Sequence, residues 1–197
     1  MNINIAVMAG GQSRRFKADK TLELFDGKPL IQHSVDRLSE IADKIIVVAK
    51  DCRKYSFLEV KCLEDDYFVQ CPMVGILTAL KHFNAPVFTV AADVPFPNPE
   101  HVKKLFKALK GHFCAIPDIE GKVHPLYSCY STDVIPAFEK ALAAEEYSLM
   151  KALKDLDVVY LNNEHLFCSE SEKKSFININ TREDYLLAKR YTGVSDD

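Results

Sequence analysis

Short apolar runs alternate with amphipathic stretches over the first half of the chain, and this alternation limits the possible folds more than any other sequence feature. The apolar runs are rich in β-branched residues and stop at glycine or polar residues, which is typical of strands buried in a parallel sheet. We expect strands at 3–9, 45–49, 58–63 and 86–92. Between them, apolar side chains at helical spacing predict helices at 29–42, 73–83 and 102–109. This pattern predicts a doubly wound, mostly parallel α/β sheet.

The second half of the chain adds an antiparallel element. The turn residues 120–122 join a strand expected at 113–117 to another at 123–130, and so tight a connection favours antiparallel pairing. Further helices are expected at 134–142 and 149–156, and further strands at 158–161 and 176–179. A last helix should begin at Thr181, whose hydroxyl can cap it, with Asp184 three residues on. The expected class is α/β with an antiparallel addition in the C-terminal half.

Length, charge and composition indicate an ordinary globular chain. We expect one domain over 1–191 and a disordered tail over 192–197, because 197 residues without repeats or low-complexity linkers suit a single α/β domain. The formal net charge of −3 gives no electrostatic reason to expect nucleic acid as a partner. No apolar run approaches the roughly 18–20 residues that span a bilayer. No basic segment precedes residues 2–9, so we expect neither a signal peptide nor a membrane partner.

The cysteines are scattered, without a C-x-x-C pair or nearby histidines at zinc-like spacing. We interpret them as reduced, mostly buried thiols of a cytoplasmic protein, with a metal or disulfide role as the alternative. The six positions are Cys52, Cys62, Cys71, Cys114, Cys129 and Cys168.

The loop after the first strand carries the main functional signal. Gly10 and Gly11 let the backbone approach a phosphate and point its N–H groups inward. Arg14, Arg15 and Lys20 add positive charge suited to phosphate oxygens. Ligands of open α/β sheets bind beyond the carboxyl ends of strands, where this loop lies. The spacing is neither G-x-x-x-x-G-K-[ST] nor G-x-G-x-x-G. The alternative is a tight turn beside a solvated basic surface.

This segment resembles the signature of nucleotidyltransferases with a nucleotide-diphospho-sugar transferase fold. Within that group, residues 9–15 (Ala-Gly-Gly-Gln-Ser-Arg-Arg) with Asp19-Lys20 are most similar to the molybdenum cofactor guanylyltransferases. That family joins GMP, taken from GTP, to molybdopterin and releases pyrophosphate. The resemblance, which extends as far as Thr181, implies that Lys20 contacts the triphosphate. The nucleotide contacts expected from the same loop are Met8, Ala9, Gly10, Gly11 and Ser13.

The chain departs from the family pattern at three places. Residues 16–18 (Phe-Lys-Ala) replace the usual Met-Gly-x, and Val48 replaces a polar residue often found at the end of the second strand. Gln70-Cys71-Pro72-Met73-Val74-Gly75 stands where the family commonly has G-P-L-x-G. Pro72 and Gly75 match, and Gly75 is a candidate nucleotide contact because this segment normally lines the base pocket. Nucleotide binding is therefore better supported than the identity of the base.

Two acidic positions are expected at the same edge of the sheet as the glycine loop. Asp93 ends the strand at 86–92, and Asp65 follows the strand at 58–63. Magnesium is usually held by one or two carboxylates together with phosphate oxygens and water, so Asp93 is the candidate Mg²⁺ ligand. The alternative is an Asp93 that caps the following turn. The resemblance implies the metal role for Asp93, within an Asp-x-Pro triplet, and a role in holding guanosine for Asp65.

The candidate residues for the acceptor come from two later segments. His124-Pro125-Leu126 is similar to the family's H-P-[LT] segment, and residues 176–181 are similar to its F-x-N-[IV]-N-T stretch. Asn178 and Asn180, two apart on an expected strand, would project to one face. The alternatives are a packed His124 and an Asn180 that leads into the Thr181 cap. The remaining histidines, at 33, 82, 101, 112 and 165, show no coherent spacing and are expected at surface or helix positions.

The implied reaction is an in-line attack by the phosphate of molybdopterin on the α-phosphorus of GTP. Because that nucleophile is already ionised near neutral pH, no general base is required, and catalysis should rest on positioning and on charge neutralisation by Mg²⁺, Lys20, Arg14 and Arg15. Two alternatives stay open. One is a cytidylyltransferase acting on molybdopterin or on a sugar or polyol phosphate, and the other is a catalytically silent nucleotide-binding module. Transient contact with proteins that deliver or receive the cofactor is a further expectation.

Overall fold

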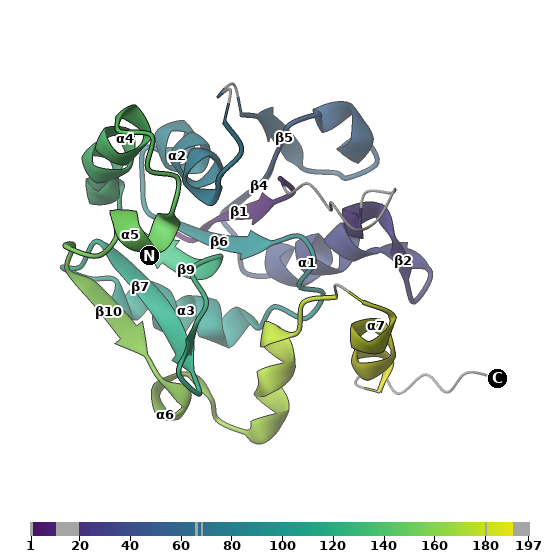
Figure 1. The fold of residues 1–197 in the computed structure, drawn as a ribbon. Helices are drawn as coiled ribbons and strands as arrows, with labels where there is room; N and C mark the ends of the chain where they lie inside the picture. Colours follow the sequence, from purple (N-terminus) through teal and green to yellow (C-terminus); the bar gives the residue numbers. More distant parts are fainter. Residues whose placement is uncertain (1, 11–19, 66, 68, 180, 191–197) are drawn as a thin grey trace.

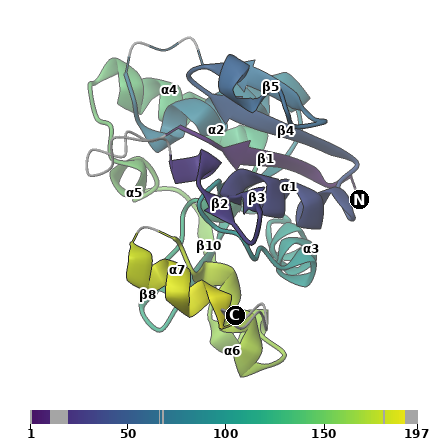
Figure 2. The same ribbon diagram turned by 90° about the vertical axis from the view of Figure 1, so that its right-hand side faces the viewer.

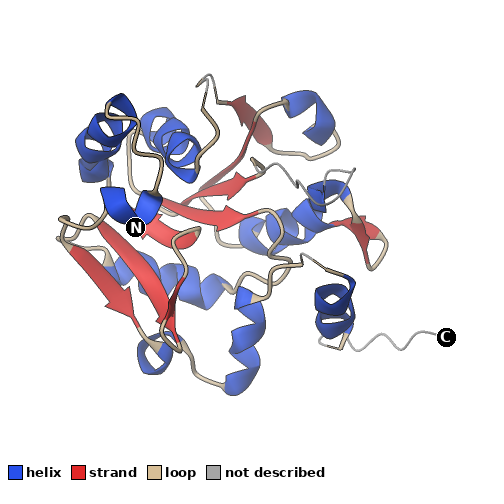
Figure 3. Ribbon diagram, in the orientation of Figure 1, coloured by secondary structure: helices blue, strands red, loops and turns tan. Residues whose placement is uncertain are grey.

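Strand β1 (Asn4–Met8) lies in the middle of the main sheet, and its burial explains the apolar run that encodes it. In the computed structural model, which describes residues 2–10, 20–65, 67, 69–179 and 181–190, helices pack on both faces of this sheet (Figure 3). Ile5 and Val7 belong to the core on one face, and Ala6 belongs to the core on the other. A strand buried on both faces needs apolar residues at successive positions, as this run has.

Eight strands of the described residues form one sheet in the order β10-β7-β9-β6-β1-β4-β5, with β8 paired to β7 outside that order (Figure 1). Strand β1 is parallel to both β4 and β6, β4 is parallel to β5, and β9 is antiparallel to β6 and β7. The other strands are β4 (Lys44–Ala49), β5 (Lys61–Glu64), β6 (Val87–Ala91), β7 (Cys114–Ile119), β8 (Lys122–Val123), β9 (Tyr127–Tyr130) and β10 (Val158–Leu161). The predicted mostly parallel sheet with a C-terminal antiparallel addition is confirmed.

Two pairs of helices cover the sheet. Helices α1 (Leu30–Ser39) and α3 (Pro99–Ala108) pack on one face, and α2 (Pro72–Phe83) and α4 (Ile135–Ala143) pack on the other. The shorter helices are α5 (Leu149–Ala152), α6 (Asn163–Leu166), η1 (Lys20–Leu22), η2 (Cys52–Tyr55), η3 (Thr132–Val134) and η4 (Glu170–Phe176). None of the helices within the described part of the chain is long and apolar enough to span a membrane.

A third apolar cluster joins the last helix to a small hairpin. Strands β2 (Leu24–Phe25) and β3 (Lys28–Pro29) form this hairpin, and helix α7 (Arg182–Lys189) lies beside it (Figure 2). The rings of Phe25 and Tyr185 meet edge to face with centroids 5.3 Å apart. Thr181 and Asp184 form a reciprocal capping box at the start of α7, as predicted.

Two sequence predictions about local structure are wrong. The strand expected at 58–63 is confined to β5, because residues 58–60 form a bend. The strand expected at 176–179 does not form: Phe176 ends the 3₁₀ helix η4, and residues 177–179 have no regular structure. Its alternating pattern has a different cause. The ring of Phe176 packs among other aromatic rings, and Ile179 is buried in the third apolar cluster.

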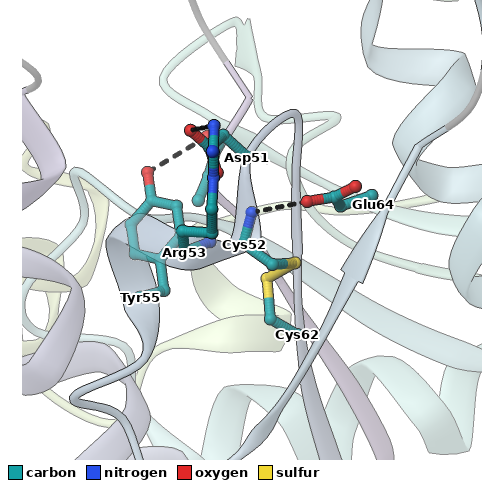
Figure 4. The surroundings of a disulfide bond; sticks show 7 residues. Asp51, Cys52, Arg53, Tyr55, Cys62 and Glu64 are labelled. Atoms are coloured by element: carbon teal, nitrogen blue, oxygen red, sulfur yellow. Dashed lines mark hydrogen bonds and ion pairs between the residues drawn. A yellow bond between two sulfur atoms is a disulfide. The ribbon is translucent and has the colours of Figure 1, made fainter.

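The prediction that all cysteines are reduced is also wrong. Cys52 and Cys62 form a disulfide that joins η2 to β5 (Figure 4). Parallel pairing of β4 with β5 brings the two together, because Val47 lies opposite Cys62 while Cys52 follows a few residues after β4. The backbone N–H of Cys52 donates to the Glu64 carboxylate at 3.1 Å, a second link between the same elements. The free cysteines are Cys71, Cys114, Cys129 and Cys168, of which Cys168 is exposed.

Candidate functional site

The carboxyl ends of four neighbouring strands meet at one edge of the sheet. Beyond the strands themselves, Ala9 N–H donates to the Val48 carbonyl at 2.8 Å, and Ala92 N–H donates to the Met8 carbonyl at 3.1 Å. Asp65 N–H donates to the Ala49 carbonyl, also at 3.1 Å. These bonds fix the first residues after β1, β5 and β6, so the start of the glycine loop and both predicted acidic positions lie at the same edge. Open α/β sheets bind ligands at this edge.

The described residues include only part of the predicted nucleotide loop. Met8 is half-buried at the end of β1, and Gly10 is exposed, with open space where a side chain would lie. Lys20 begins η1, but its side chain lies outside the described residues. The other predicted positions outside the described residues are Gly11, Ser13, Arg14, Arg15 and Asn180.

Gly75 contributes to the site by leaving space for Met8. It is buried in α2, and a Cβ atom added there would lie 2.1 Å from Met8 Cε. The tip of the Met8 side chain therefore fills the space that a side chain at position 75 would occupy. Gly75 and Met8, both predicted from the family resemblance as nucleotide contacts, lie against each other.

The backbone around Asp93 is held from two sides. The Asp93 carbonyl accepts the N–H of Ile179 at 3.0 Å, and the next carbonyl, that of Val94, accepts the hydroxyl of the fully buried Ser34 at 2.5 Å. Ser34 interrupts the apolar face of α1, and sequence reasoning assigned it no role. Its hydroxyl, together with Ile179, fixes the loop that carries the half-buried Asp93 carboxylate.

The donor set at Asp93 suits a hard cation shared with a ligand. A carboxylate supplies the oxygen that Mg²⁺ prefers, and Mg²⁺ is commonly held by one or two carboxylates together with phosphate oxygens and water. Among the described residues, no three His, Cys, Asp or Glu side chains are grouped as a complete metal site. The residues present therefore fit a metal held between Asp93 and a phosphate rather than one enclosed by protein ligands.

Asp65 has a charged partner that sequence reasoning missed. Lys50, the residue after β4, forms an ion pair with the Asp65 carboxylate, whose side chain is only 9 % exposed. The same ammonium donates to the Tyr67 carbonyl at 2.5 Å and lies 3.3 Å from the Asp65 carbonyl. Lys50 thus fixes both the carboxylate and the backbone at the start of the β5–α2 loop. The sequence did carry a signal for this partner: Lys50 directly follows a buried strand that ends at the same edge of the sheet.

His124, predicted to contact the acceptor, lies near the same edge of the sheet. It falls between β8 and β9, where Tyr127 of β9 is paired with Val90 near the carboxyl end of β6. Its ring lies 4.6 Å from the ring of Phe176, measured between centroids. Burial lowers the pKa of His124 to about 4, with Lys122 acting in the same direction and Asp118 opposing. The imidazole is therefore neutral at pH 7, is half-buried and packs against Phe176.

Asn178 is placed near the same edge of the sheet by its neighbours in the chain. It is exposed and lies between Phe176, which contacts His124, and Ile179, which hydrogen-bonds the Asp93 carbonyl. The structure thus brings His124 and Asn178 to the Asp93 edge. Because the segment is not a strand, the expectation that Asn178 and Asn180 share one face loses its basis.

The family model and the relatives that this chain matches point to the same protein family. Residues 5–159 match the family model described as the MobA-like NTP transferase domain. A protein of Thermococcus gammatolerans named probable molybdenum cofactor guanylyltransferase is 36 % identical over 195 residues, which cover 95 % of this chain and 98 % of that protein.

Two solved structures show the same fold. Molybdopterin-guanine dinucleotide biosynthesis protein A from Archaeoglobus fulgidus superposes with a TM-score of 0.85 at 28 % identity, over 96 % of this chain and 98 % of that one. The 4-diphosphocytidyl-2C-methyl-D-erythritol synthase of Anaerococcus prevotii has a TM-score of 0.71 at 17 % identity, over 98 % and 99 % of the two chains, and supports the fold alone.

Proposed function

The chain belongs to the MobA-like NTP transferase family, and from that premise we propose that it transfers GMP from GTP to the phosphate of molybdopterin. Pyrophosphate is released, and molybdopterin guanine dinucleotide is the product. The observation that carries the proposal is that Ala9 and Gly10, at the start of the glycine loop, lie at the same edge of the sheet as Asp65 and Asp93. Residues 1–191 are proposed to form the single nucleotidyltransferase domain.

The proposed nucleotide half of the site combines the β1 loop with the two acidic positions. Asp65 holds the guanosine, and Asp93 holds Mg²⁺. When bound, Mg²⁺ supplies charge neutralisation at the phosphate oxygens. Lys20, Arg14 and Arg15 hold the triphosphate by their charge, and the remaining contacts are assigned to Met8, Ala9, Gly10, Gly11, Ser13 and Gly75.

The proposed reaction requires no general acid or general base from the protein. A phosphate monoester is ionised near neutral pH, so the attack on the α-phosphorus depends on alignment and on stabilisation of negative charge. The neutral ring of His124 agrees with this, because its low pKa makes it a poor cation and a poor proton donor at pH 7. We assign His124 a hydrogen-bonding role toward the pterin, together with Asn178 and Asn180.

A second candidate is cytidylyl transfer to molybdopterin or to a sugar or polyol phosphate. The ion pair between Lys50 and Asp65 supports this second candidate, because Lys50 neutralises the carboxylate that the guanosine is proposed to use. The Gln70-Cys71 departure lies in the segment expected to line the base pocket. Proteins that deliver or receive the cofactor are the expected transient partners.

Isothermal titration of GTP, CTP and ATP with Mg²⁺ tests the nucleotide assignment. Tight, metal-dependent binding of GTP alone supports guanylyl transfer, and a preference for CTP would replace it by the second candidate. Binding of none of the three would count against nucleotidyl transfer and favour a catalytically silent partner-binding module.

Asp93→Ala tests the catalytic edge. We expect pyrophosphate release to fall roughly 100-fold or more, because a preorganised charge interaction with the reacting phosphates is lost. Asp157→Ala is the matched control, since Asp157 precedes β10 at the opposite edge of the sheet. Unchanged turnover in Asp93→Ala would remove Asp93 from the mechanism.

A further inference from the structure

A fully buried histidine lies outside the proposed chemistry. His101 in α3 has an exposed fraction of 0 % and yet makes two polar contacts. Its Nε2 atom lies 2.9 Å from a Glu172 carboxylate oxygen of η4, and its Nδ1 atom lies 3.4 Å from the Tyr127 hydroxyl of β9. Three elements distant in the sequence are therefore joined at one imidazole.

The direction of the hydrogen bonds follows from their partners. The backbone N–H of Asn98 donates to the Tyr127 oxygen at 2.9 Å, and the Ser175 side chain also hydrogen-bonds this hydroxyl. With a neutral His101 ring, the Tyr127 hydroxyl can donate its proton to Nδ1. Nδ1 then accepts, and Nε2–H donates to the Glu172 carboxylate, which accepts only. Each buried group has a partner with a neutral imidazole, and burial correspondingly lowers the pKa of His101, with Glu172 opposing.

The network fixes the end of η4, where Phe176 lies. The ring of Phe176 stacks on the ring of His101 at an interplanar angle of 22°, with centroids 5.8 Å apart. It also contacts Tyr127 at 4.7 Å and His124 at 4.6 Å. Figure 1 shows this segment between α6 and α7, alongside α3. His101 thus holds the ring that packs against the proposed acceptor residue His124.

The same segment reaches the metal side of the site. Three residues after Phe176, the N–H of Ile179 donates to the Asp93 carbonyl at 3.0 Å. The exposed Asn178 lies between these two fixed points. A change at His101 or Glu172 is therefore transmitted to Asn178, His124 and the Asp93 loop through contacts between neighbouring groups.

We propose that His101 and Glu172 are positioning residues for the acceptor: they hold residues 176–179 so that Asn178 and His124 together form the surface for a phosphate monoester of a heterocycle. This inference rests on the proposed function. It predicts that the two residues affect binding of the acceptor more than binding of the nucleotide.

Two variants and a control test the inference. His101→Phe keeps a ring against Phe176 and removes both hydrogen bonds. Glu172→Gln keeps the size and an acceptor oxygen, and it should fold even if His101→Phe does not, because Glu172 is 20 % exposed. The control is His112→Phe, since His112 also pairs with a carboxylate, that of Asp157 at 3.0 Å, but at a partly exposed position on the opposite edge of the sheet.

The first readout is amide hydrogen exchange of the peptide that contains Ile179. We expect exchange of that amide to speed up at least tenfold in His101→Phe and not in His112→Phe. The second is the steady-state KM with molybdopterin and GTP varied in turn. The acceptor KM should rise at least fivefold in His101→Phe and less in Glu172→Gln, while the KM for GTP stays within twofold.

The outcomes separate this inference from the proposed function. Unchanged exchange, an unchanged acceptor KM, or equal rises of both KM values would overturn the positioning role while wild-type transfer persists. A wild-type enzyme that transfers no nucleotide to molybdopterin would instead refute the proposed function, and the acceptor role of His101 with it.

Discussion

Breaking the disulfide between Cys52 and Cys62 should destabilise the protein by a calculable amount. The bond closes a loop with a sequence separation of 10 residues. A crosslink restricts the unfolded chain, and for a loop of about 10 residues the lost entropy corresponds to about 2.7 kcal/mol at 25 °C. In a chain of this size, each kcal/mol changes the midpoint by about 2–4 °C, so we expect the Tm to fall by about 5–11 °C.

The assay compares thermal and urea unfolding of the oxidised protein, the protein with dithiothreitol, and Cys52→Ser/Cys62→Ser. Reduction and double substitution should give the same loss, because both open the same loop. Cys168→Ser is the control, since Cys168 is exposed and forms no disulfide, and a serine hydroxyl can still accept from Lys104, so the Tm should stay unchanged. Equal midpoints for the oxidised and reduced wild type, with the bond verified by thiol titration, would refute the loop-entropy reasoning.

Two further predictions concern charged and titratable groups. Lys50→Met should lower the free energy of unfolding by about 1–3 kcal/mol in urea, because it leaves the Asp65 carboxylate buried without its ammonium, a cost reduced by the partial exposure of Lys50. Lys50→Arg should retain most of that free energy, and equal stability of wild type and Lys50→Met would contradict the contact. For His124, the pKa is about 4 in the folded protein and about 6.5 in the unfolded chain, so the unfolded state binds more protons between these values and stability falls as pH drops through that window. His124→Phe should reduce the loss of stability between pH 6.5 and 4 and should not change how the free energy of unfolding depends on pH between about 7 and 8. Identical pH profiles of wild type and variant would refute the lowered pKa of His124.

The carboxyl edge of the sheet, where nucleotide binding is proposed, could be predicted because the sequence patterns that define it are local. A buried parallel strand needs a continuous apolar run, and the residue after it necessarily lies at the carboxyl edge. Asp93 and Asp65 could therefore be placed before the structure was known, and so could the Thr181–Asp184 capping box, whose two partners lie three residues apart. Their roles toward a ligand stay predictions.

The misplaced features depend on contacts distant in the sequence. Phe-Ile-Asn-Ile has the alternation of a strand, but Phe176 packs against the rings of His101 and Tyr127, which lie far earlier in the sequence and which no local pattern shows. The disulfide depends on the register of β4 with β5 and not on cysteine spacing. His101 was recognisable only as a helix residue, because its burial and its partner Glu172 arise from tertiary packing.

This difference in origin predicts how the two halves of the site respond to change. The nucleotide half is built from backbone hydrogen bonds between adjacent strands, which most side-chain substitutions leave intact. The acceptor half is held by side chains of α3, β9 and η4, with His101 at their junction, so a single substitution there alters how Phe176 and Asn178 are presented. Variation in α3 and η4 should therefore change the choice of acceptor, whereas variation that changes the choice of nucleotide should fall around Lys50, Asp65 and the start of α2.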